Sequence, residues 1–157
     1  MNNQEIERKF LVKDDSFKRM ATTCHMIEQG YLCKDKERVV RIRRCDDKAY
    51  LTIKAHNPES NMSHFEFERE IDVDSAGQLL EHCLPGRIQK ERYIVPYGDI
   101  VVEVDVFHGD NEGLVVAEVE LQSEDQTFAC PPFFSDEVTD DLRYYNAYLS
   151  DHPYRTW

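Results

Sequence analysis

Hydrophobic and polar residues alternate along most of this chain. This is the pattern of a β-strand with one buried face, because successive side chains of a strand point to opposite sides. The alternating segments are rich in Val, Ile, Tyr and Phe, which favour strands. Eight strands are predicted, over residues 5–12, 27–33, 38–45, 49–54, 64–73, 87–95, 100–107 and 114–122. Several connections are short enough for hairpins, so neighbouring strands should be antiparallel, and eight of them can close into a barrel.

Two segments have helical spacing instead. Residues 75–84 carry an apolar side between a capping residue, Asp74 or Ser75, and a Pro-Gly stop. A second helix is predicted over residues 140–149, with Thr139 as its cap. Its apolar side would be formed by Leu142, Tyr145 and Leu149. The fold class is therefore mainly β (α+β), and the absence of repeats or linker-like composition favours one domain over residues 1–157.

The polar face of the predicted strands carries an ordered set of charges. The residues that share a face, strand by strand, are Glu5, Glu7 and Lys9; Arg41 and Arg43; Thr52 and Lys54; Glu66, Glu68 and Glu70; Lys90 and Arg92; Glu103 and Asp105; and Glu118 and Glu120. One interpretation is a solvated sheet face, on which opposite charges across strands contribute about 0.2 to 1 kcal/mol each. Against it, like charges stack roughly 6 to 7 Å apart along single strands, which costs stability without counter-ions.

A closed sheet with these faces inward would hold acids and bases in one cavity. Clustered carboxylates suit hard divalent cations such as Mg²⁺, while clustered Arg and Lys suit phosphate oxygens. A metal-bound polyphosphate would satisfy both sets of charges at once. A nucleic acid would be repelled by the acids.

Composition narrows the class of protein. The 157 residues include 19 Lys and Arg against 31 Asp and Glu, a net charge of −12, which argues against a general nucleic-acid or anionic-membrane binder. No apolar run approaches the roughly 18 residues of a membrane span. The first residues lack the pattern of a signal peptide, and the five cysteines form no C-x-x-C pair, so a cytoplasmic protein with free thiols is expected. The six histidines show no metal-ligand spacing and are interpreted as structural.

The ordered charges also resemble a known family. Residues 5–9 match the E-x-E-x-K signature of the CYTH superfamily, the triphosphate tunnel metalloenzymes. The later charged pairs follow in the family's order, with Phe107-His108-Gly109 following Glu103 and Asp105. Residues 136–146 resemble the C-terminal stretch of short bacterial members, and residues 29–32 resemble their second strand. The resemblance implies an eight-stranded antiparallel tunnel with helices packed outside. It also implies that a C-terminal helix closes one mouth, and we expect Arg143 near the phosphate path.

The resemblance further implies roles for single residues. The phosphate ligands would be Lys9, Arg41, Arg43, Lys54, Lys90 and Arg92. The ligands of Mg²⁺ or Mn²⁺ would be Glu5, Glu7, Asp105, Glu118 and Glu120. Glu7, Lys9 and Tyr31 would act in catalysis, Lys9 by stabilising the leaving phosphate and Tyr31 by a hydrogen bond near the scissile bond. Glu66, Glu68 and Glu103 would support these groups or orient water, while no catalytic role is assigned to Glu70 or Arg8.

The function expected from these features is metal-dependent hydrolysis of a triphosphate, with inorganic tripolyphosphate as the first candidate. One alternative is conversion of ATP to cyclic AMP, as in class IV adenylyl cyclases, which would need an adenine pocket. Others are hydrolysis of thiamine triphosphate or a nucleoside triphosphate, and a non-catalytic polyphosphate-binding module. The expected partner is a small polyphosphate or organic triphosphate, and a homodimer is the default oligomer.

Overall fold

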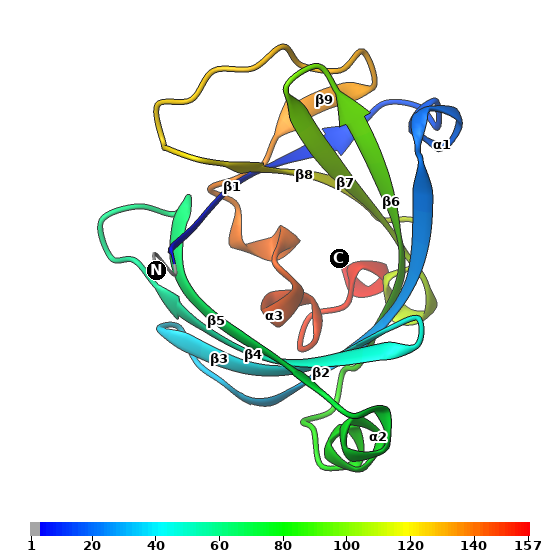
Figure 1. Cartoon of the computed structure of the whole chain (residues 1–157), viewed down its shortest axis with the longest axis vertical. Helices are drawn as coiled ribbons and strands as arrows, with labels where there is room; N and C mark the ends of the chain where they lie inside the picture. The colour runs from blue at the N-terminus through cyan, green and yellow to red at the C-terminus, as the bar shows by residue number, and fades with distance from the viewer. Residues whose placement is uncertain (1–3) are drawn as a thin grey trace.

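An antiparallel sheet curls into a closed barrel in the computed structural model, which describes residues 4–157 (Figure 1). Its strands are β1 (Gln4–Val12), β2 (Thr23–Lys34), β3 (Arg38–Cys45), β4 (Lys48–His56), β5 (Ser63–Ile71), β6 (Ile88–Tyr97), β7 (Ile100–Phe107), β8 (Val115–Leu121) and β9 (Phe134–Glu137). The spatial order is β5-β4-β3-β2-β6-β7-β8-β1, and β5 pairs with the start of β1 to close the ring. The predicted eight-stranded antiparallel barrel is confirmed.

The structure adds one strand that the sequence pattern did not reveal. β9 is four residues long and pairs with the end of β1, beyond the point where β1 leaves β5. Its sequence shows no alternation long enough to separate it from a loop. β2 also begins four residues before the predicted start at residue 27, and β5 ends two residues before the predicted end at residue 73.

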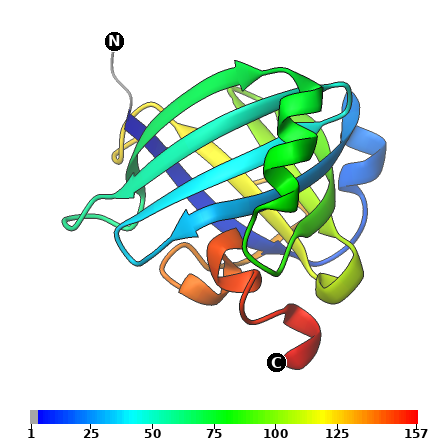
Figure 2. The same ribbon diagram turned by 90° about the horizontal axis from the view of Figure 1, so that it is seen from below.

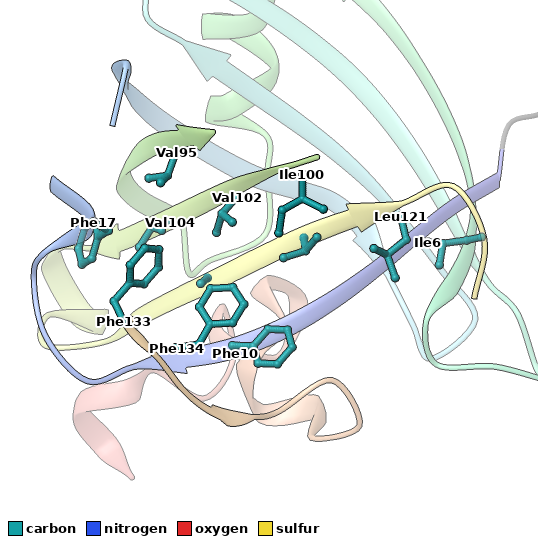
Figure 3. Close-up of a cluster of buried hydrophobic side chains, with 12 residues drawn as sticks. Ile6, Phe10, Phe17, Val95, Ile100, Val102, Val104, Leu121, Phe133 and Phe134 are labelled. Carbon is teal, nitrogen blue, oxygen red and sulfur yellow. The ribbon is translucent and has the colours of Figure 1, made fainter. Parts of the chain in front are cut away.

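The largest hydrophobic cluster lies on the outer side of the barrel, not inside it. Figure 3 shows Phe133 and Phe134 over the apolar faces of β1, β7 and β8, with Phe17 of the short helix α1 (Phe17–Met20) at one end. The rings of Phe10 and Phe134 stack at 4.4 Å between centroids. The outward residues of these strands are therefore buried by added segments, which leaves the inward positions available for charge.

A second cover lies over β3 and β4. The helix α2 (Val73–Glu81) places Ala76 and Leu80 against Ile42 and Ala49. It was predicted over residues 75–84. The true start is two residues earlier because Asp72 is the cap, its side chain accepting a hydrogen bond from the Ser75 N–H at 2.8 Å, and the helix ends at residue 81.

Close packing below α2 depends on Gly30 of β2. A Cβ built on Gly30 would lie 2.9 Å from the Cβ of Cys83, closer than real side chains approach. A glycine at this strand position lets the end of α2 approach the sheet.

The C-terminal helix predicted over residues 140–149 is wrong as a continuous helix. The chain forms a 3₁₀ turn (Leu142–Tyr144) and then a short helix, α3 (Asn146–Leu149), separated by Tyr145 in an extended conformation. The turn is capped by Asp141, not by Thr139, and Leu142 is 62% exposed, so it does not pack on the barrel.

The same segment nevertheless lies across one mouth of the barrel, inside the ring in Figure 1 and on one side of it in Figure 2. Leu149 of α3 is fully buried against Ile88, Phe107 and Val116, whose side chains face inward at this end. The C-terminal residues therefore close one end of the interior, in part through this apolar cluster. Within residues 4–157, no helix is both long and apolar enough to cross a membrane.

Candidate active site

A cavity of about 570 Å³ occupies the barrel interior, and most of the charged residues chosen from the sequence line it. Those at the cavity wall are Glu5, Glu7, Lys9, Tyr31, Arg41, Arg43, Lys54, Arg92, Glu118 and Glu120, together with Glu66, Glu68 and Glu103. They face inward because they occupy alternate positions of their strands, while the intervening apolar residues face outward. The two-residue period of the strands thus identifies which charged residues face the cavity.

Three carboxylates converge at one part of this cavity. Oxygens of Glu5, Glu7 and Glu118 all lie within 4.8 Å of one another. The antiparallel register of β1 and β8 produces this arrangement by setting Lys9 opposite Glu118 and Glu7 opposite Glu120. Glu7 is buried, and its Oε2 has no hydrogen-bond partner among residues 4–157. An unpartnered carboxylate oxygen in a cluster of acids is suited to a hard divalent cation.

Lys9 is the main counter-charge of these acids. Its Nζ lies 2.8 Å from Glu118 and 3.5 Å from Glu7, and 4.6 Å from the centre of the Tyr145 ring. Burial alone would lower the pKa of Lys9, but the two carboxylates more than offset it and raise the pKa above its usual value. In the same way, burial would raise the pKa of Glu7, but Lys9 and Lys54 bring it below its usual value. Lys9 and Glu7 are therefore both charged.

The basic wall is formed by Arg41 and Arg43 of β3, with Lys54 of β4 and Arg92 of β6. The Arg41 guanidinium donates to Thr52 at 3.2 Å and lies 3.9 Å from Glu68, while its buried Nε has no partner among residues 4–157. The Arg43 Nε donates to Gln29 at 3.1 Å. Burial, followed by the charges of Arg41 and Arg92, lowers the pKa of Arg43 to about 9. Such crowding of cations favours an anion in the cavity.

Lys54 and Arg92 are held by acids on nearby strands, Arg92 by the adjacent β7 and Lys54 by β1. Lys54 lies 3.2 Å from Glu5, and Arg92 lies 2.7 Å from Glu103. Arg92 also makes two hydrogen bonds to Asp105, at 2.8 and 2.9 Å. Each of these cations faces the cavity and can reorient toward a bound anion.

Lys90 and Asp105 do not lie where the sequence led us to expect. Lys90 is fully buried, 2.8 Å from Asp105 and 3.0 Å from the Asn146 side-chain oxygen, and neither Lys90 nor Asp105 lines the cavity. Asp105 is outside the cluster of three carboxylates, and burial, which would raise its pKa, is overcome by Arg92 and Lys90, so its pKa is well below the usual range. Lys90 instead joins the barrel wall to α3 at the closed mouth, with Asp105 as its charge partner.

Glu120 lines the cavity beside the carboxylate cluster without belonging to it. Burial raises its pKa, and the charges of Glu103, Glu7 and Glu118 raise it further. Tyr31 is buried at the same cavity, and burial raises the pKa of its hydroxyl, although Arg41, Lys54 and other cations oppose this. Tyr31 is therefore a hydrogen-bond donor.

Several residues that line the cavity were not predicted from the sequence as site residues. His64 precedes Glu66 on the inward face of β5, and its Nδ1 is buried with no partner among residues 4–157. The alternation of β5 could have revealed it, since His64, Glu66 and Glu68 share one phase. Tyr145 and Asn146 also line the cavity, but their positions depend on the fold of the C-terminal segment.

Arg143 does not approach the cavity, contrary to expectation. Its guanidinium lies 2.6 Å from Asp141 and 5.1 Å from the centre of the Trp157 ring, on the exposed side of the C-terminal segment. The break at Tyr145 explains this, because a continuous helix would have turned these residues differently.

Comparison with known proteins identifies similar chains. A family model described as the CYTH domain matches residues 3–149. A protein of Acetivibrio thermocellus named inorganic triphosphatase is 41% identical over 155 residues, 98% of this chain and 97% of its own length. One of Nitrosomonas europaea with the same name is 37% identical, over 93% of this chain and 96% of its own length. A solved structure of the inorganic triphosphatase NE1496 superposes with a TM-score of 0.65 at 35% identity, covering 93% of each chain.

Proposed function

The chain belongs to the CYTH family, and from this membership we propose that it is a divalent-metal-dependent inorganic triphosphatase. The observation that carries the proposal is the cavity itself, with a carboxylate cluster on one wall and a set of crowded cations on the other. The overall reaction adds water across a phosphoanhydride bond of tripolyphosphate and releases phosphate and pyrophosphate. Relatives that are 41% and 37% identical along almost their whole length are named for this activity.

The carboxylate cluster fits a hard divalent cation, Mg²⁺ or Mn²⁺. Glu5, Glu7 and Glu118 would hold it, Glu120 lines the cavity beside them, and the orphan Oε2 of Glu7 is the oxygen that most needs a cation. When bound, the metal neutralises phosphate oxygens and lowers the pKa of coordinated water. Asp105 is the weakest of the five proposed metal ligands because Arg92 and Lys90 already occupy its oxygens.

The chain's own cations would bind the three phosphates. Arg41 and Arg43 offer guanidinium groups that are only partly satisfied, mainly by the neutral side chains of Thr52 and Gln29. Lys54 and Arg92 contact acids from which they can turn away. Charge-assisted hydrogen bonds from such groups contribute about 1.5–3 kcal/mol each. Lys90 could reach phosphate only after leaving Asp105 and Asn146, so its role as a ligand is the least supported.

Three residues are proposed to act on the reacting bond. Lys9, charged and buried beside the carboxylates, would neutralise the oxygen that departs with the leaving phosphate. Tyr31 would donate a hydrogen bond near the scissile bond, since its hydroxyl retains its proton. Glu7 would orient water as well as metal, because one of its oxygens has no partner.

The decisive experiment compares tripolyphosphate, ATP, thiamine triphosphate and pyrophosphate at one Mg²⁺ concentration. We expect kcat/KM to be highest for tripolyphosphate, since three phosphates can contact cations from several strands and a nucleoside adds bulk without an evident contact. Pyrophosphate should be poor or inhibitory. Pyrophosphate as the best substrate would refute the proposal, and cyclic AMP formed from ATP would indicate a cyclase. Tripolyphosphate bound without turnover under Mg²⁺ and Mn²⁺ would indicate a binding module.

Three further expectations from the sequence stay predictions. They are a single domain over residues 1–157, a cytoplasmic location and a homodimer. Limited proteolysis, cell fractionation and light scattering of the purified protein test them in turn.

A further inference from the structure

A second group of metal-ligating side chains lies away from the carboxylate cluster. It contains His25 of β2, Cys45 at the end of β3 and Asp46 in the following turn, and one ligand atom from each lies within 4.8 Å of the other two. His25 Nδ1 is 2.6 Å from Asp46 Oδ2. The group thus offers one nitrogen, one sulfur and one oxygen atom.

This donor set is suited to a different ion from the one expected at the carboxylates. Zn²⁺ binds imidazole, thiolate and carboxylate together, at about 2.0–2.3 Å, whereas Mg²⁺ prefers oxygen alone. Tetrahedral bonds of that length separate ligand atoms by roughly 3.3–3.7 Å. The His25–Asp46 contact would therefore lengthen by about 0.7 Å. The Cys45 thiol already lies within 4.8 Å of both ligand atoms, and rotation of these side chains, two of which are partly exposed and one exposed, can bring the three around one ion.

The local backbone already orients two of the ligands. Asp46 has a positive φ of 54°, which turns its side chain back toward β2, where Oδ1 accepts a hydrogen bond from the Met26 N–H at 2.9 Å. His25 Nε2 lies 3.4 Å from the Thr23 hydroxyl. Partners of this kind fix the orientation of metal-ligating imidazoles and carboxylates.

A purely structural role, in which these side chains only hold the turn in place, would explain His25 and Asp46 but not Cys45. The His25–Asp46 contact holds β2 to the β3–β4 turn, but it does not involve the thiol of Cys45, which makes no hydrogen bond within the described part of the chain. Burial raises the pKa of this thiol, and Asp46 adds to the effect, so metal binding would release a proton. Cys45 is two residues beyond Arg43 on the inward face of β3. Glu5, Glu7 and Glu118 belong to β1 and β8, which within residues 4–157 pair with neither β2 nor β3.

We propose that His25, Cys45 and Asp46 form a binding site for one thiophilic divalent cation of the Zn²⁺ type, separate from the carboxylate cluster. Three protein ligands leave a fourth position of the tetrahedron for water. The proposal does not depend on the triphosphatase activity.

Co²⁺ is the probe, because a cobalt–thiolate bond adds near-ultraviolet charge-transfer absorption that carboxylate ligands do not produce. The protein is titrated with Co²⁺ in excess Mg²⁺, which occupies the carboxylate cluster. We expect the absorption to saturate at one equivalent and to disappear when Zn²⁺ displaces Co²⁺. Cys45→Ser should abolish it, and His25→Gln should weaken Co²⁺ binding at least tenfold.

Cys24→Ser is the matched control, since Cys24 neighbours His25 in sequence but is exposed beside Glu91. It should leave the absorption unchanged. Loss of the signal in Cys24→Ser, its persistence in Cys45→Ser, or no thiolate signal in the unmodified protein would each overturn the proposal. Should Cys45→Ser fail to fold, alkylation of the unmodified protein decides: Zn²⁺ should slow modification of Cys45 at least tenfold and that of Cys33 not at all, and equal rates at Cys45 would overturn the site.

Discussion

Replacing Lys9 with methionine tests how the carboxylate cluster is balanced in the metal-free barrel. Lys9 is only 3% exposed and lies between Glu118 and Glu7. Methionine preserves most of the side-chain volume but removes the charge, so two carboxylates would lose their nearest cation. Breaking a buried ion pair from one side costs about 3–5 kcal/mol. For a protein of this size that lowers Tm by about 6–20 °C in chelator.

A divalent cation should reverse most of this loss. The ion would take over neutralisation of the carboxylates without having to compete with the Lys9 ammonium group. A single site at a hundredfold excess over Kd adds about 2.7 kcal/mol to the free energy of unfolding. The rise in Tm on adding Mg²⁺ should therefore be larger for Lys9→Met than for the unmodified protein. Turnover should stay at least tenfold lower even so, because the proposed stabilisation of the leaving phosphate is gone.

Calorimetry with chelator and with saturating Mg²⁺, paired with phosphate release from tripolyphosphate, measures each effect separately. Lys13→Met is the matched control, since Lys13 follows the same strand but is exposed. Equal loss of Tm in the two variants, or a metal-induced rise no larger in Lys9→Met, would refute the account of Lys9 as the buried counter-charge. Full turnover by Lys9→Met would instead refute its catalytic role.

The other predictions concern stability, substrate binding and packing. Glu120 has a pKa above its ordinary 4.5, so the native state binds more protons than the unfolded chain. In chelator, the difference in unfolding free energy between Glu120→Gln and the unmodified protein should shift in favour of the variant as pH rises above 4.5. Parallel pH profiles of the two proteins would contradict this. Arg41→Ala should raise KM for tripolyphosphate about tenfold or more, whereas Arg143→Ala, outside the cavity, should change it less than twofold; initial-rate kinetics on both variants distinguish them. Gly30→Ala should lower stability by about 1–3 kcal/mol in urea unfolding, whereas Gly77→Ala, which meets no atom within 4 Å, should be neutral or stabilising, and equal effects would exclude the close approach of α2 as the cause.

Much of the barrel could be predicted because a strand has a simple two-residue period. Glu5, Glu7 and Lys9 had to share a face, and so did Arg41 and Arg43, whatever the rest of the fold. What the period does not give is the height of each residue along the barrel axis, which depends on strand tilt and stagger. Lys90 and Asp105 therefore face inward as expected but lie at the closed mouth, against Asn146.

The C-terminal segment was harder to predict for a different reason. Its apolar spacing suggested a helix, yet Tyr145 is extended and its hydroxyl donates to the Thr139 carbonyl at 2.8 Å, while its ring lies over Lys9. Contacts with the barrel thus override the local preference for helix. The spacing of residues in the sequence does not predict such contacts. The predicted position of Arg143 was wrong for the same reason.

The pairing of opposite charges inside the barrel suggests how metal and substrate would depend on each other. Lys54 contacts Glu5 and Lys9 contacts Glu118, so two proposed metal ligands are bound to two proposed phosphate ligands. A cation that binds these carboxylates would release both ammonium groups to face the cavity at the moment when phosphate oxygens can accept them. Coupling between two ligands is reciprocal, so a polyphosphate that draws the lysines away would in turn expose the carboxylates to metal. On this reasoning, metal and polyphosphate each strengthen binding of the other.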